Sequence, residues 1–218
     1  MVAGPVCDEL GGMRGLLVSG FAAIGAGSAA MLALHAGSDL DPLRSVISEY
    51  AFQPAGWLLT ASLTSLAAGS VLIAEALRRA GAGRWVVVLL LAWAASMFLI
   101  GAFPTDRPGV PLSLSGGIHR YAAFAAFAVM PIAGLLLARA RIRYAGAVRV
   151  LSGVALAALV LVVIPYVVRM AGLPPADDDI PAGLTQRIVV VTELGVLALA
   201  GLSMLRPARR AVPGLAQA

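Results

Sequence analysis

The sequence has 218 residues, of which 60% are hydrophobic and 12% charged, and its formal net charge is +5. Soluble globular domains carry about 25% charged residues, so this composition excludes an ordinary soluble domain and indicates a membrane protein. The basic residues are all arginine and lie near the ends of apolar runs, which argues against a nucleic-acid-binding protein. The single cysteine, Cys7, excludes an internal disulfide and a cysteine-based metal cluster.

Six apolar runs are long enough to cross a bilayer as helices, which takes about 18 or more residues each. They lack the alternation of barrel strands, so the predicted fold class is all-α, a polytopic bundle of six transmembrane helices. We predict a transmembrane domain over residues 15–205, between an N-terminal tail of residues 1–14 and a C-terminal tail of residues 206–218. The predicted spans are residues 15–35, 54–77, 85–103, 118–138, 147–170 and 184–205.

The sixteen arginines divide unequally between the two ends of the predicted bundle. Eleven lie before the first span, after the last span, or in the loops after spans two and four. The positive-inside rule therefore places this end, with both termini, in the cytoplasm, and places the protein in the cell membrane. The first span is too long for a signal-peptide core, so we expect a retained anchor. The five arginines of the opposite, outer end are Arg44, Arg107, Arg120, Arg169 and Arg187.

The first outer loop, HAGSDLDPLRSVISEYAFQPAGW, contains a predicted short helix. Asp41 followed by Pro42 is a typical helix start, with an acid at the N-cap and proline at the first position. Apolar side chains then recur at helical spacing, so we expect an amphipathic helix in the outer interface of the membrane, with Ser48 and Glu49 on its polar side. These apolar residues are Leu43, Val46, Ile47 and Tyr50.

The second outer loop and the start of span four read FPTDRPGVPLSLSGGIHR, residues 103–120. TDRPG has the composition of a turn, and the unpaired backbone N–H groups where span four begins favour an anion. Arginine can bind a phosphate or carboxylate, and an acid or a histidine can transfer a proton. This stretch therefore supplies four candidate site residues, Asp106, Arg107, His119 and Arg120.

Two acids inside the predicted spans differ in their surroundings. Glu75 is followed at three and four positions by Arg78 and Arg79, which predicts a structural ion pair. Glu193 lies about nine residues into span six, without a charged residue three or four positions away, and Gln186 lies on nearly the same face. Because an ionised group at membrane depth costs roughly 2.5–3.5 kcal/mol, Glu193 is protonated, paired with another helix, or part of a polar cavity.

No pattern in the sequence predicts a metal or another cofactor. His35 and His119 could lie at the same depth, but neither a third ligand nor a haem-attachment motif accompanies them. The aspartates at residues 177–179 are consecutive, so their side chains cannot all converge on one ion, and we expect a solvated acidic run. Common catalytic signatures of hydrolases, zinc proteases and phosphate loops are missing.

Five segments of the chain read DPLRSVISEYAF, GWLLT, FPTDRPG, GGIHRYAAFAAF and GLTQRIVVVTELG. In this order and spacing they resemble the motifs of the bacterial membrane-protein family called domain of unknown function 998. The resemblance covers roughly residues 15–205 and implies a six-helix fold. It also implies a loose kinship with eukaryotic membrane proteins that are tied to lipid handling.

By position, the resemblance implies that the polar motif residues of the family fall on Ser48, Glu49, Asp106, His119 and Arg187. Family members often carry an acid before the arginine that opens span six, whereas this sequence has Gln186 there. If that acid carries a proton in relatives, this chain would use Glu49, Asp106 or Glu193 instead.

We therefore predict a polar pocket that opens at the outer end of the bundle. The first hypothesis is a small membrane enzyme that uses acid–base chemistry on a lipid or isoprenoid-like amphiphile. The alternatives are a non-enzymatic lipid carrier or transporter, in which Glu193 matters more, and an accessory membrane subunit whose outer loops form a docking surface. The predicted catalytic residues are Glu49, Asp106 and His119, and the predicted substrate-binding residues are Ser48, Arg120, Arg187 and Glu193.

Overall fold

The computed structural model describes residues 5–107, 109–140, 142–170 and 180–205. This described part is helical, without a strand, and six of its helices are long and apolar enough to cross a membrane. The predicted fold class is therefore confirmed. The elements are α1 (Pro5–Ala36), the short 3-10 helix η1 (Ile47–Phe52), α2 (Trp57–Arg79), α3 (Arg84–Ala102), α4 (Leu114–Arg139), α5 (Ala145–Met170) and α6 (Ala182–Leu205).

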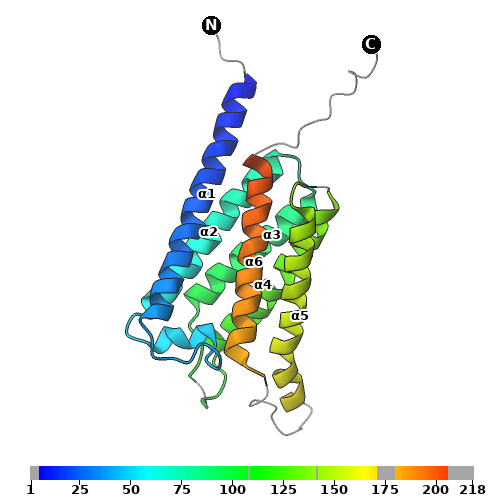
Figure 1. The fold of residues 1–218 in the computed structure, drawn as a ribbon. Helices are drawn as coiled ribbons and strands as arrows, with labels where there is room; N and C mark the ends of the chain where they lie inside the picture. The colour runs from blue at the N-terminus through cyan, green and yellow to red at the C-terminus, as the bar shows by residue number, and fades with distance from the viewer. Residues whose placement is uncertain (1–4, 108, 141, 171–179, 206–218) are drawn as a thin grey trace, which may run out of the picture.

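The six long helices form a bundle in which each packs against the next along the chain (Figure 1). α1 packs mainly on α2, whereas α6 contacts α5 and α4 and also reaches α2 and α1, so the last helix closes the bundle. One end, which we call the terminal end, carries the start of α1 and the end of α6. The other, the loop end, carries η1 and the loops around residues 37–56 and 103–113.

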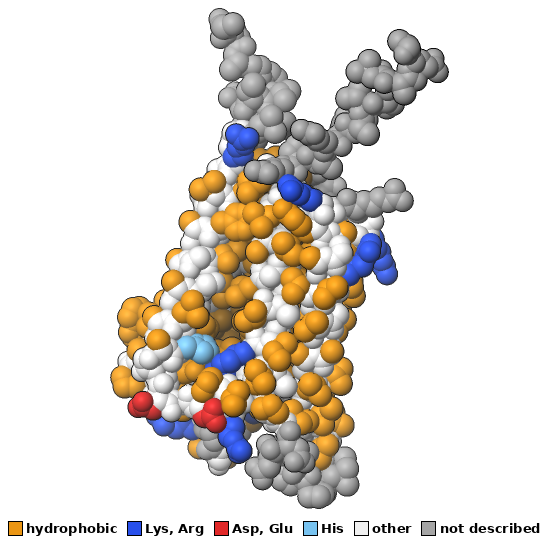
Figure 2. All heavy atoms as spheres, in the orientation of Figure 1, with side chains coloured by type: hydrophobic (Ala, Val, Ile, Leu, Met, Phe, Trp, Pro, Cys, Tyr) orange, Lys and Arg blue, Asp and Glu red, His pale blue; other side chains and the backbone are white. Residues whose placement is uncertain are grey.

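Apolar side chains fill the interior of the bundle and also cover its outside. Trp93, Leu77 and Met130 are almost completely buried, whereas Val18 and Trp57 are largely exposed. Figure 2 shows apolar side chains spread along the length of the visible face, with charged side chains toward its two ends. An apolar surface of this extent is expected for helices that contact lipid rather than water.

Two polar contacts of α2 show how the bundle satisfies groups in its spans. In the interior, the Ser62 hydroxyl donates to the carbonyl oxygen of Gly27 in α1 at 2.7 Å, a contact typical of closely packed membrane helices. At the terminal end, Glu75 pairs with Arg78 and Arg79, with N–O distances of 2.6 and 2.7 Å. The predicted ion pair is therefore confirmed.

The segment before α2 differs from the amphipathic α-helix that we predicted. The chain turns at the expected start, because the Asp41 carboxylate accepts from the Leu43 N–H at 2.9 Å and its carbonyl accepts from the Ser45 N–H at 2.8 Å. After this single turn comes only the six-residue η1. Ile47 and Tyr50, three residues apart on one side of the 3-10 helix, are buried. The prediction is wrong because this pair packs into the bundle instead of facing the membrane interface.

Candidate functional site

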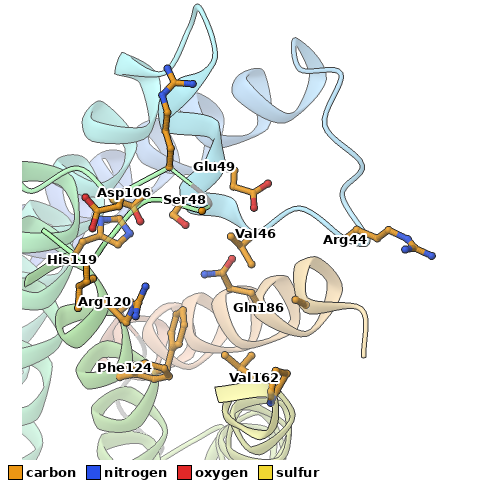
Figure 3. A pocket seen from close by; sticks show the side chains of 18 of the residues that line it. Arg44, Val46, Ser48, Glu49, Asp106, His119, Arg120, Phe124, Val162 and Gln186 are labelled. Carbon is orange, nitrogen blue, oxygen red and sulfur yellow. The ribbon is translucent and has the colours of Figure 1, made fainter. Parts of the chain in front are cut away.

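A hollow with a volume of about 960 Å³ opens at the loop end of the bundle (Figure 3). Its walls come from η1 and the residues just before it, the 103–113 loop, and the nearby parts of α4, α5 and α6. We call it the loop-end hollow. Five of the seven predicted site residues line it: Ser48, Glu49, Asp106, His119 and Arg120.

The lining of the loop-end hollow combines polar side chains, most of them from the η1 and 103–113 segments, with apolar side chains of α4 and α5. The division is not complete, because Val110, Pro111 and Leu112 add apolar groups from the loop and Arg120 adds a cation from α4. Figure 3 shows Ser48, Glu49 and Asp106 on one side, and Phe124 and Val162 on the opposite side. A ligand with a polar head and an apolar chain fits such a lining. The polar part includes Arg44, Ser48, Glu49, Asp106, Arg107, Arg120 and Gln186, and the apolar part includes Ala123, Phe124, Phe127, Leu161, Val162 and Pro165.

Asp106 stabilises the rim of the hollow where the 103–113 loop meets α4. Its Oδ1 accepts from the Ser113 hydroxyl at 2.7 Å, and its Oδ2 accepts from the Ser113 N–H at 2.9 Å. The Ser113 oxygen in turn accepts from the Gly116 N–H at 3.0 Å, as the N-cap of α4. The two hydrogen bonds from Ser113 lower the pKa of Asp106 below its ordinary value, and the bond from the hydroxyl has the larger effect. Asp106 is therefore a carboxylate at neutral pH, and both of its oxygens hold the loop.

His119 is buried, and its ring orientation is fixed by the backbone at the end of α3. Its Nδ1 lies 3.1 Å from the carbonyl oxygen of Ile100 and 2.9 Å from that of Phe103. Because carbonyl oxygens only accept hydrogen bonds, Nδ1 carries the proton, and Nε2 of the neutral ring has the lone pair. Since His119 also lines the hollow, this nitrogen can accept a proton or a hydrogen bond from a molecule bound there.

Glu49 and Arg120 present opposite charges to the hollow from different elements. Among the described residues, Glu49 takes part in neither of the two ion pairs found, which join Glu75 to Arg78 and Arg79. Arg120 is exposed beside His119 on α4, and Figure 3 shows its guanidinium and the Gln186 amide projecting into the same space. A bound molecule would therefore meet both a carboxyl group and a guanidinium.

Arg187 lies in a separate cluster and does not line the hollow. Its Nε–H donates to His35 Nε2 at 3.0 Å, and its Nη2 donates to the Tyr50 hydroxyl at 2.9 Å. Its Nη1 donates to the carbonyl oxygens of Ser45 and Gly183 at 2.8 and 2.9 Å. Four of the five N–H donors of the guanidinium thus bind protein acceptors. The structure uses Arg187 to tie η1 to α1 and α6, and does not bring it to the predicted head-group site.

His35 and Tyr50 are hydrogen-bond partners of Arg187 that the sequence did not reveal. They lie 152 and 137 residues away from it along the chain, so no spacing pattern could join them. In the structure their rings are 4.6 Å apart, and the Tyr50 ring also lies 5.6 Å from the guanidinium carbon. The sequence indicated only that all three residues lie near the same end of the bundle, His35 late in α1, Tyr50 in η1 and Arg187 early in α6.

The first turns of α6 hold the chain around η1 by close backbone approach. Gln186 Oε1 accepts from the Ile47 N–H at 2.6 Å, and the Leu184 N–H donates to the Leu43 carbonyl at 3.1 Å. A Cβ atom at Gly183 would lie 2.5 Å from the Ser45 carbonyl oxygen, so only glycine permits this approach. The amide of Gln186 keeps its NH2 group to donate into the hollow that it lines.

Glu193 lies deeper in the bundle and does not line the hollow. Its side chain is 1% exposed, and its Oε2 accepts from Trp93 Nε1–H of α3 at 3.0 Å. It lines a smaller cavity of about 50 Å³, which we call the inner cavity. Ser48, His119 and Gln186 line both this cavity and the hollow. Of the three alternatives predicted for Glu193, the structure supports a partner on another helix, Trp93. Glu193 also lines a cavity, but most residues of that cavity are apolar.

The described residues contain no group of three or more histidine, cysteine, aspartate or glutamate side chains that could hold a metal ion. His35 uses both ring nitrogens within the protein, because Nδ1 donates to the Met31 carbonyl at 2.8 Å and Nε2 accepts from Arg187. The predicted acidic run at residues 177–179 lies outside the described residues.

A family model described as protein of unknown function (DUF998) matches residues 21–203 of the chain. The matched region includes η1, the start of α6 and every residue of the loop-end hollow. The expected resemblance to the domain of unknown function 998 is therefore confirmed. The comparisons with curated proteins and with solved structures gave no match.

Gly116→Ala should disturb the rim of the hollow, whereas Gly117→Ala should leave it intact. A Cβ atom at Gly116 would overlap the carboxylate of Asp106, while one at Gly117 meets nothing within 4 Å. Losing the Asp106–Ser113 hydrogen bonds and the N-cap costs about 1–2 kcal/mol, so the thermal unfolding midpoint in detergent should fall further for Gly116→Ala. Equal midpoints for the two variants would contradict this role of Asp106.

Proposed function

The chain belongs to the DUF998 family, described as proteins of unknown function, and we propose its function from the site itself. The protein binds a membrane amphiphile, a lipid or an isoprenoid-like molecule. The polar head lies at the rim of the loop-end hollow, and the apolar chain lies along the α4 and α5 side. The observation that carries this proposal is one large hollow, in a six-span membrane protein, whose lining combines charged side chains with an apolar group on α4 and α5.

The size and charge of the hollow support an anionic head group. Its volume of about 960 Å³ is at the upper end of small-molecule sites, which typically span about 300–1,000 Å³. Guanidinium groups bind phosphate and carboxylate through paired hydrogen bonds, so an excess of arginine favours an anion. The charged lining consists of three arginines, Arg44, Arg107 and Arg120, and two acids, Glu49 and Asp106.

The distribution of arginine supports an outward-facing hollow. Among the described residues, seven arginines lie at or near the terminal end, and the hollow lies at the other end. These are Arg14, Arg78, Arg79, Arg84, Arg139, Arg143 and Arg149. By the positive-inside rule, this distribution favours a cytoplasmic terminal end. An amphiphile from the outer leaflet would reach the hollow without crossing the membrane.

Single cysteines at the two ends should react with a membrane-impermeant maleimide from opposite sides. In a Cys7→Ala background, Asp39→Cys places a thiol in the exposed loop before η1, and Ala80→Cys places one in the exposed loop after α2. In intact cells we expect labelling of Asp39→Cys at once, and of Ala80→Cys only after permeabilisation. The reverse pattern would place the hollow on the cytoplasmic side.

Arg120→Gln should weaken the binding of an anionic amphiphile much more than that of a neutral one. Farnesyl phosphate and farnesol share one chain and differ in the phosphate, so they separate head-group binding from chain binding. By native mass spectrometry we expect Arg120→Gln to lower the affinity for farnesyl phosphate about tenfold, or about 1.4 kcal/mol, and to leave farnesol unchanged.

The matched control for this experiment is Arg84→Gln, because Arg84 is exposed at the terminal end beside Trp85. It should bind both probes as the wild type does. If the two variants lose the same affinity, or if Arg120→Gln loses none, the hollow is not the head-group site.

A second candidate function is acid–base catalysis on the bound amphiphile. It is favoured by one observation, that Glu49 and the fixed ring of His119 line the same hollow. A carboxyl group and a neutral imidazole nitrogen facing one ligand are suited to give and take a proton. Asp106, the third predicted catalytic residue, has both oxygens bound to Ser113 and is better suited to hold the rim.

If the site is catalytic, Glu49→Gln should abolish conversion of an amphiphile while binding persists. Wild-type protein incubated with a membrane lipid extract would then change the mass of one component in liquid chromatography–mass spectrometry. Removal of a proton-transfer group slows a reaction about 10²–10⁴-fold, so the change should disappear in Glu49→Gln and remain in the control Glu75→Gln. Binding by the wild type without any conversion would instead favour a carrier.

A further inference from the structure

The carboxyl group of Glu193 has only one hydrogen-bond partner among the described residues. Oε2 accepts from the Trp93 indole N–H, whereas Oε1 is buried without a partner. No arginine or histidine in the described part lies within ion-pair distance of this group. A carboxylate without a cation is strongly disfavoured at membrane depth, so the group carries a proton.

The hydrogen bond from Trp93 decides which oxygen holds this proton. An indole N–H can only donate, so Oε2 acts as the carbonyl oxygen and Oε1 carries the hydroxyl hydrogen. A buried O–H group without an acceptor is unfavourable, and Glu193 lines the inner cavity. Most of the cavity lining is apolar, but Ser48, His119 and Gln186 line it together with Glu193 and supply the polar partners that a water needs. The cavity volume of about 50 Å³ also exceeds the about 10–15 Å³ that one water needs, so water can act as the acceptor.

The inner cavity leads toward the loop-end hollow through walls that the two share. Ser48, His119, Ala123, Phe127 and Gln186 line both spaces. The hydroxyl of Ser48 and Nε2 of His119 can each bind a water between them. Among all the residues that line the inner cavity, only His119 and Glu193 are titratable. The lining residues from α1, α2, α3 and η1 carry no titratable side chain.

We propose that Glu193 is a proton-binding site that exchanges its proton with the loop-end hollow through water in the inner cavity, past His119 and Ser48. The proton leaves Oε1 for a neighbouring water, and another proton returns along the same path, so the carboxyl group is charged only briefly. A proton site that shares walls with a ligand site can couple protonation to binding. The exchange itself does not depend on whether the hollow binds an amphiphile.

Infrared spectroscopy tests whether Glu193 is protonated and bound to Trp93. In ether-linked lipid, which has no ester carbonyls, the wild type minus Glu193→Gln difference should contain one carboxylic-acid C=O band. The band should move to higher frequency in Trp93→Phe, because its carbonyl oxygen loses the indole hydrogen bond. No acid band in this difference, or a band that Trp93→Phe leaves unmoved, would overturn the assignment. Glu75→Gln, at the exposed terminal end, should leave the band unchanged.

The rate of deuterium exchange tests the route. Ala123 lines both cavities, whereas Ala125 on the same helix is exposed. Ala123→Leu should therefore slow the shift of the Glu193 band in D2O at least tenfold, and Ala125→Leu should not. Equal rates in the two variants would show that the proton takes another path. Because exchange is measured without added amphiphile, a failure here is distinguishable from a failure of the proposed binding function.

Discussion

The guanidinium of Arg187 is the contact on which the loop end depends. From the start of α6 it reaches α1 through His35 and the η1 region through Tyr50 and the Ser45 carbonyl. η1 is too short to keep its place by its own hydrogen bonds, so it needs such external anchors. A planar group with five donors can satisfy acceptors in several directions, which a lysine ammonium cannot match. Because Glu49 belongs to η1, these hydrogen bonds of Arg187 also fix its position at the hollow.

The polar residues of the loop end fall into two groups by what their hydrogen bonds do. Arg187 and Asp106 form their hydrogen bonds within the protein. Arg187 binds Tyr50 of η1, and Asp106 binds Ser113 in the turn before α4. Glu49 and His119 both line the hollow, and the hydrogen bonds of His119 Nδ1 to backbone carbonyls leave its Nε2 available. A site requires both kinds, because groups that meet a ligand act only if others hold them in place. The three predicted catalytic residues are therefore not equivalent.

The number and type of spans could be predicted because a bilayer leaves an apolar chain only helices or closed barrels. The meeting of Glu49, Asp106 and His119 could also be predicted, since their segments emerge at one end of the bundle. The form of η1 could not, because residues three apart fit both the α-helix and the 3-10 helix. Nor could the role of Arg187, because it depends on where distant backbone carbonyls lie after folding.

Depth in the membrane separates charged from neutral chemistry at this site. On α6, Gln186 and Glu193 are seven residues apart, two turns along one face, and both line the inner cavity. The Gln186 amide carries no charge, and the buried Glu193 carboxyl group is neutral because it is protonated, as proposed above. The guanidinium of Arg187 lies toward His35 of α1 and Tyr50 of η1 instead. The charged groups of the hollow consequently come from η1, from the loops and from Arg120 on α4. A charged head group of the proposed ligand would therefore stay at the rim, and the space beneath it suits water or a neutral group.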